Sequence, residues 1–352
     1  MSDTEQLIEA LDSRVRRREE RRAFFKVALG AAAVGAGAFA FATPAAAQTV
    51  TDTDILNFAL NLEYLEAQFY SYAAFGTGLN ASLLGGVTTT GAQGSVSTSG
   101  SNPPRQVDFS GDPLIGQYAR EIAADEIAHV AFLRTALTAT AAVAQPAINI
   151  SGDAASAFTA AGRASGVVTP TGPNGAFTDA DIFDPYASPN NFLLASFIFE
   201  DVGVTAYKGS AALLTSKVFL EAAAGILAVE AYHAAIVRTA LYARGINAPA
   251  LIDATEKISN ARDTLDGAPA VDLVRGVGPD DDQGIAPMTI SGPLLPASGI
   301  GSNIAPLNAN GLAYSRTAQQ VLNIVYLNRA AVTLGGFFPA GVNGTIRTSA
   351  AN

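Results

Sequence analysis

The chain has 352 residues, 49% hydrophobic and 15% charged, so it can readily bury a large core. A net charge of -10 at pH 7 argues against nucleic acid or an anionic membrane surface as the main partner. The absence of cysteine excludes disulfides, thiolate zinc sites, iron–sulfur clusters and thiol catalysis. Only two histidines occur, so any imidazole chemistry must use His129 or His233.

Residues 1–47 have the three parts of an export signal. A basic region that includes Arg21 and Arg22 precedes an Ala- and Gly-rich apolar run over residues 27–42, and small residues follow at 45–47. This order predicts a signal peptide, and the paired arginines resemble the bacterial twin-arginine signal. The alternative is a membrane anchor, but the run is short and weakly apolar for a span of about 20 residues. We therefore expect a periplasmic or secreted protein with no stable membrane span after signal removal.

Four segments of the remaining chain carry the apolar periodicity of helices, namely residues 55–74, 114–142, 189–208 and 216–244. Gly209 is expected to interrupt the third of these helices, and Gly245 to end the fourth. A fifth helix is expected over residues 313–331.

Three long stretches rich in Gly, Ser, Thr or Pro separate these helices, at residues 76–111, 145–187 and 266–311. The long middle connection, followed by a short one between the third and fourth helices, fits a bundle with one crossover. We therefore expect an all-α fold. Its four-helix bundle would cover residues 52–245, and a Pro/Gly-rich extension over 246–352 would pack one helix on the bundle.

Each of the four bundle helices places one glutamate about halfway along its apolar face. The order along the chain is Glu, Glu-x-x-His, Glu, Glu-x-x-His, and both histidines of the protein take part in it. The candidate site residues are Glu63, Glu126, His129, Glu200, Glu230 and His233.

A buried carboxylate must be paired, protonated or bound to a metal. The apolar stripes that carry these glutamates contain no lysine or arginine, whereas two divalent cations supply the four positive charges that four carboxylates need. Carboxylate oxygen with imidazole nitrogen is a ligand set for iron or manganese, while magnesium and calcium prefer oxygen alone. The alternative is a network of core polar residues that satisfy one another.

Two tyrosines and a further glutamate accompany these residues. Tyr70 follows Glu63 by seven residues, and Tyr207 follows Glu200 by seven. Glu66, one turn after Glu63, could be the ligand in its place, but the repeated tyrosine spacing favours Glu63. Glu66 would then contact the ligands without binding metal, or would be an additional ligand. Tyr70 is either an aromatic residue of the core or a residue that contacts the site.

The pattern resembles the ferritin-like superfamily, in which a four-helix bundle holds a di-iron or di-manganese centre. The resemblance implies two iron or manganese ions. It assigns Glu63 and Glu200 as single carboxylates, Glu126 and Glu230 as bridging ones, and the two histidines as imidazole ligands.

More narrowly, the chain is similar to the bacterial relatives of the desiccation-related ferritin-like proteins. The similar segments are residues 60–67, 125–130, 320–326 and 335–339. This resemblance implies protection during drying or stress. Two features of the sequence depart from other branches: the lack of cysteine removes a rubredoxin-type iron site, and methionine occurs only at positions 1 and 288, so no haem-bridging methionine lies in the bundle. The long insertions argue against a closed storage cage.

Three functional hypotheses follow. The first is an oxidoreductase that reacts with peroxide or dioxygen, as a ferroxidase, a peroxidase or a protein similar to manganese catalase. The second is a non-catalytic metal-binding or structural stress protein of the cell envelope. The third, a helical scaffold with a degenerate centre, is disfavoured because all six positions are present. The choice of metal, the substrate and any homo-oligomeric state stay open.

Overall fold

The computed structural model describes residues 50–267, 282–291, 295–308 and 310–352. The predicted signal peptide lies outside the described residues, as does much of the third long stretch. In chain order the described helices are α2 (Asp52–Phe75), α3 (Pro113–Leu137), α4 (Ala157–Ser165), α5 (Pro189–Ala211), α6 (Lys217–Gly245), α7 (Pro249–Asp266) and α8 (Ala318–Val325). Short 3-10 turns lie at Ala81–Leu83 and Pro173–Gly175, and strands β1 (Met288–Ile290) and β2 (Gly299–Gly301) form an antiparallel pair.

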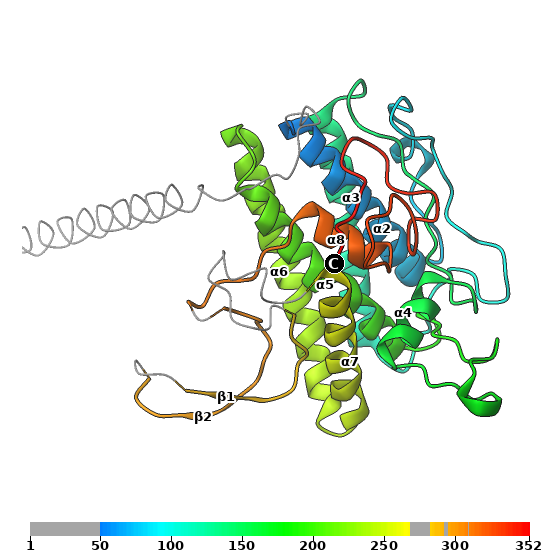
Figure 1. Ribbon diagram of the computed structural model, residues 1–352, viewed down its shortest axis with the longest axis vertical. Coiled ribbons are helices and arrows are strands. Elements are labelled where there is room, and N and C mark those ends of the chain that lie inside the picture. Colours follow the sequence, from blue (N-terminus) through cyan, green and yellow to red (C-terminus); the bar gives the residue numbers. More distant parts are fainter. Residues whose placement is uncertain (1–49, 268–281, 292–294, 309) are drawn as a thin grey trace, which may run out of the picture. The chain divides into compact units, whose positions relative to one another are not determined.

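The predicted all-α fold is confirmed, with α2, α3, α5 and α6 as the bundle (Figure 1). Helix α2 packs mainly on α3, and α5 on α6, while α2 also contacts α5 and α3 contacts α6. The long connection from α3 to α5 is the crossover, and it contains the short helix α4, which the sequence did not predict. Each bundle helix thus has two bundle neighbours, so a side chain halfway along its inner face points toward the other three helices.

The helix ends follow local chemistry. A capping box between Thr51 and Asp54 starts α2. Helix α3 ends at Leu137, earlier than predicted, because Thr138 takes a positive φ of 67°. The prediction that Gly209 interrupts the third helix was wrong, since α5 continues to Ala211. A Cβ at position 209 would lie 1.9 Å from the carbonyl oxygen of Arg316, so this glycine instead lets the extension cross the helix closely.

The extension differs from its prediction. Its described residues contain two helices, α7 and α8, rather than one, and α8 covers only Ala318–Val325 of the predicted 313–331. Helix α8 stops early because Leu327 adopts a left-handed φ of 53°. Helix α7 was missed although Pro249 at its first turn and its buried residues at helical spacing are typical helix signals.

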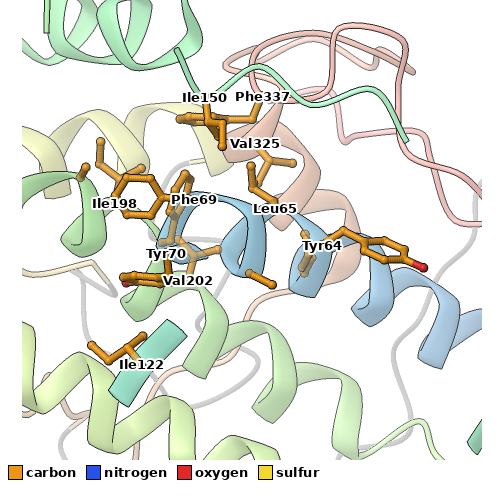
Figure 2. Close-up of a cluster of buried hydrophobic side chains, with 14 of the residues drawn as sticks. Tyr64, Leu65, Phe69, Tyr70, Ile122, Ile150, Ile198, Val202, Val325 and Phe337 are labelled. Atoms are coloured by element: carbon orange, nitrogen blue, oxygen red, sulfur yellow. The ribbon is translucent and has the colours of Figure 1, made fainter. Parts of the chain in front are cut away.

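Figure 2 shows that side chains from the bundle and from the extension meet in one hydrophobic cluster. Leu65 and Phe69 come from α2, Ile198 from α5, and Val325 and Phe337 from the extension, and all five are buried. The extension therefore completes the hydrophobic core around helices α2 and α5.

A second contact joins the extension to the bundle through buried ion pairs. Arg262 of α7 lies 3.0 Å from Asp201 of α5 and 2.6 Å from Asp282 of the extension. Arg238 of α6 pairs with the same Asp201 at 2.8 Å, and Arg316 pairs with Asp282. These arginines form ion pairs with aspartates. Their positive charge is therefore balanced by those aspartates and not by the four glutamates of the bundle centre.

Candidate metal centre

The six predicted site residues meet at the centre of the bundle. Each of the helices α2 and α5 contributes one glutamate, and each of the helices α3 and α6 contributes a glutamate and a histidine. All six are buried, and they are Glu63, Glu126, His129, Glu200, Glu230 and His233.

The first group gathers around His129. Its Nδ1 atom lies 3.3 Å from Oε2 of Glu63, 3.6 Å from Oε2 of Glu126 and 3.4 Å from Oε1 of Glu230. Ligand atoms bound at about 2.1 Å to one ion lie about 3.0–3.4 Å from one another. The spacing of these four atoms therefore suits a single cation between them.

The second group gathers around His233 and consists of Glu200, Glu230 and His233, with Glu126 close to the histidine. The Nδ1 atom of His233 lies 3.0 Å from Oε1 of Glu126 and 3.8 Å from Oε2 of Glu200. Glu230 also belongs to this group, as it does to the first. Glu126 and Glu230 thus face both histidines, whereas Glu63 faces one and Glu200 the other.

Several polar atoms of the cluster approach one another within 3.0–3.8 Å but form no hydrogen bond. Buried polar atoms are nearly always hydrogen-bonded, because an unpaired one costs about 1–3 kcal/mol. In the described part of the chain, eight buried atoms of the six residues have no hydrogen-bond partner. They are Glu63 Oε2, Glu200 Oε2, both carboxylate oxygens of Glu126 and of Glu230, His129 Nδ1 and His233 Nδ1. Six carboxylate oxygens and two imidazole nitrogens without hydrogen bonds are a set of donor atoms that could hold metal ions.

Two tyrosines form hydrogen bonds to Glu63 and Glu200, and each tyrosine lies on the helix opposite its glutamate. Tyr70 of α2 donates a hydrogen bond to Oε1 of Glu200 on α5, and Tyr207 of α5 donates one to Oε1 of Glu63 on α2. Burial and the neighbouring carboxylates raise the pKa of both phenols well above 10, so both stay protonated as donors. Each bond leaves the Oε2 atom of its glutamate facing the histidines.

Glu66 lies beside the groups rather than in them. It is buried in α2 and borders a cavity of about 20 Å³ that Gly203 and apolar side chains also line, which is room for about one water. Burial, and then the charge of Glu230, raises the pKa of the Glu66 carboxyl well above 4.5. Of the two glutamates between which the sequence left a choice, the structure brings Glu63 to a histidine.

Gly203 makes room for a shared carboxylate. A Cβ at this position would lie 2.5 Å from Oε2 of Glu230 and 3.6 Å from Oε1 of Glu66. We expect Gly203→Ala to displace Glu230 and to lower the affinity for metal by about 10-fold or more. Substitutions of residues that contact metal ligands typically have effects of this size. Metal content after dialysis and metal titration of the stripped protein measure the effect.

Gly225→Ala is the matched control for Gly203→Ala, because Gly225 lies in helix α6 with nothing within 4 Å of its Cβ position. It should keep full metal content and gain up to about 1 kcal/mol of stability from helix propensity. Equal metal binding by Gly203→Ala and wild type would contradict the position we assign to Glu230.

The charges of the metal-free cluster are unbalanced. Burial, together with the charge of neighbouring glutamates, raises the pKa of Glu63, Glu200 and Glu230 to about 8. Burial opposes the ionisation of Glu126, but the two imidazoles beside it outweigh this and lower its pKa to about 2. Burial lowers and the carboxylates more strongly raise the pKa of His233, to about 10, and that of His129 also rises well above 6.5. Without metal, bound protons therefore offset part of the negative charge of the four glutamates.

Metal uptake near pH 7 should consequently release protons from the cluster, because its carboxyls and imidazoles share protons that bound cations would displace. Carboxyls with a pKa of about 8 are mostly protonated at pH 7, so the apparent affinity for metal should rise as pH increases toward 8 and fall as pH decreases. Calorimetric titrations in buffers of different ionisation enthalpy count the protons. An affinity for metal that is flat from pH 5 to pH 8 would contradict this assignment.

Comparison with known proteins identifies the family of the chain. The family model of the ferritin-like domain matches residues 51–243, and the chain belongs to this family. It is 30% identical over 278 residues to desiccation-related protein PCC13-62 of Craterostigma plantagineum. The aligned region covers 77% of this chain and 76% of the relative. It is 27% identical over 304 residues to ferritin-like catalase Nec2 of Nesocodon mauritianus, which covers 84% of each chain. No solved structure matches the chain.

Sequence reasoning missed two residues around the cluster. Asp125 contacts His233, with its Oδ2 atom 3.1 Å from the ring Nε2, and it directly precedes Glu126 in the chain. Gly203 follows Glu200 by three residues, as Glu66 follows Glu63. That internal repeat was a signal that could have pointed to position 203.

Proposed function

We propose that this protein is an exported ferritin-like di-metal protein that binds two iron or manganese ions through the six residues of the centre. It would protect against oxidative or desiccation stress by redox chemistry with peroxide or with ferrous iron. The proposal rests on eight buried oxygen and nitrogen atoms that form no hydrogen bond. These atoms lie around His129 and His233 and include one nitrogen of each. A relative named as a catalase and another named as desiccation-related support the reaction and the setting.

Two bound ions of this kind would together give up two electrons to reduce peroxide, or accept two electrons to oxidise it. The residues of the chain orient and shield that chemistry. Tyr70 and Tyr207 hold Glu200 and Glu63 in place by hydrogen bonds, and the core excludes bulk water from the glutamates. Burial and the charge of Glu230 raise the pKa of the Glu66 carboxyl, so Glu66 adds less negative charge near the centre than an exposed glutamate would.

Elemental analysis of the exported protein, followed by a peroxide assay, tests the proposal. We expect about two ions per chain, with peroxide consumption or ferrous oxidation that depends on them. A metal content under about 0.2 ions per chain would overturn the metal assignment, because folding of a site with such ligands is strongly coupled to metal binding. A metal-replete protein that neither consumes peroxide nor oxidises ferrous iron would instead be a non-catalytic stress protein.

Export has its own test in a bacterial host. Replacing Arg21 and Arg22 with lysine should keep the precursor in the cytoplasm if the twin-arginine route is used. Normal export of this variant, measured by cell fractionation, would contradict that route.

A further inference from the structure

The two halves of the metal centre differ behind their histidines. The Nε2 atom of His233 lies 3.1 Å from Oδ2 of Asp125, on the neighbouring helix α3. The Nε2 atom of His129 has no hydrogen-bond partner within the described residues, and the His129 side chain is 10% exposed against 2% for His233. Both groups include Glu230, and Glu126 lies within 3.6 Å of each histidine, but only His233 has a carboxylate at its Nε2 atom.

The difference is encoded in the sequence. Helices α3 and α6 present equivalent Glu-x-x-His pairs, so Glu126 corresponds to Glu230 and His129 to His233. Asp125 directly precedes Glu126, and the residue in the same place before Glu230 is Val229. A valine side chain cannot accept a hydrogen bond, so α6 has no counterpart of the contact that Asp125 makes.

The contact with Asp125 acts on His233 in two ways. A carboxylate on Nε2 favours the tautomer with its proton there, which leaves the lone pair on Nδ1 toward Glu126 and Glu200. An outer carboxylate of this kind also fixes the ring and raises the basicity of the metal-binding nitrogen. His129 receives neither effect from a described residue.

We infer that the two metal positions are inequivalent and that Asp125 is the positioning residue that sets them apart. The position at His233 binds its ion more tightly. The position at His129, whose imidazole is nearer to solvent, holds the exchangeable ion. This inference rests on the proposed metal binding and does not depend on any redox activity.

Variants with one histidine removed isolate each position. His129→Gln leaves the position at His233, and His233→Gln leaves the position at His129. Titration of the stripped proteins with Mn²⁺ should give an affinity about 10- to 100-fold higher for His129→Gln, the usual range for an outer-shell partner. Adding Asp125→Asn should lower the affinity about 10-fold or more in His129→Gln and leave that of His233→Gln unchanged.

A gain-of-function variant and a control complete the test. Val229→Asp in the His233→Gln background should raise Mn²⁺ affinity, because it places a carboxylate where α6 lacks one. Glu121→Gln, which removes an exposed carboxylate one turn before Asp125, should change neither affinity. Thermal unfolding of the metal-free forms checks that each variant is folded, and if Val229→Asp is not, the Asp125→Asn pair still decides.

Equal Mn²⁺ affinities of the two single-histidine variants would overturn the inference, as would an equal effect of Asp125→Asn on both. Failure of the wild type to bind Mn²⁺ or Fe²⁺ at all is a different result, because it would overturn the proposed function itself. In full-length wild type, electron paramagnetic resonance at one equivalent of Mn²⁺ should show mainly isolated ions, with coupled pairs forming as the second equivalent is added.

Discussion

The double variant Glu126→Ala, His129→Ala should contain almost no metal and should lose the stability that metal confers. Glu126 offers both of its oxygens to the centre, and His129 anchors one of the two groups. Their removal takes three of the eight unpartnered donor atoms. Because Glu126 lies close to both histidines, its loss takes a carboxylate from the surroundings of each, and the loss of His129 removes the only imidazole of the first group.

The loss of stability should be large. A ligand present at about 1,000 times its Kd stabilises the folded state by about 4 kcal/mol, and each kcal/mol shifts Tm by about 2–4 °C for a domain of about 200 residues. We therefore expect the metal-loaded wild type to melt about 8–16 °C above the double variant. Calorimetry together with elemental analysis measures both quantities on the same samples.

A chelator separates loss of metal from loss of packing in this double variant. Stripping should lower the Tm of wild type and leave that of the double variant unchanged. Glu221→Ala, which removes an exposed carboxylate on α6, should behave as wild type. Full metal content in the double variant would mean that the cluster is not the metal site, and an unchanged Tm would mean that metal does not stabilise the fold.

Arg262→Met should destabilise the protein by about 3–5 kcal/mol, the usual cost of removing one partner from a buried ion pair. Its guanidinium contacts Asp201, Asp282 and the carbonyl oxygen of Phe197, and all of these contacts are buried. Methionine fills similar volume but leaves two aspartates with one arginine fewer. Urea or thermal unfolding of the metal-free protein measures the loss without a contribution from metal.

The control for Arg262→Met lies on the same helix. Lys257 and Asp253 form an exposed pair at 2.8 Å, and such pairs contribute at most about 0.5 kcal/mol, so Lys257→Met should have little effect. A small effect of Arg262→Met as well would show that the buried network is not needed to hold the extension against the bundle.

Much of the bundle and its centre followed from the sequence because the signals are local. The apolar period predicted α2, α3, α5 and α6, and the spacing of Glu126 with His129 and of Glu230 with His233 placed both pairs on inner faces. Gly209 shows the limit of local reasoning. A glycine near a helix end normally stops the helix, but here it admits the backbone of Arg316 from about a hundred residues later in the chain.

The tyrosines show the same limit at the centre. A spacing of seven residues put Tyr70 on the same helix face as Glu63, but its hydroxyl donates to Glu200 of α5, and that of Tyr207 donates to Glu63. Which carboxylate a tyrosine reaches depends on how two helices are placed side by side. No periodicity within one helix contains that information.

The sequence by itself indicated the fold class, the helix faces and the six residues of the candidate centre, with Glu66 left as an alternative to Glu63, because each depends on spacing within one segment. The tertiary structure alone decided which atoms meet: the division of the glutamates between two histidines, the crossed tyrosines, the room at Gly203 and the contact of Asp125 with His233. These pairings join helices far apart in the chain, so they exist only once burial of the apolar faces has brought the helices together.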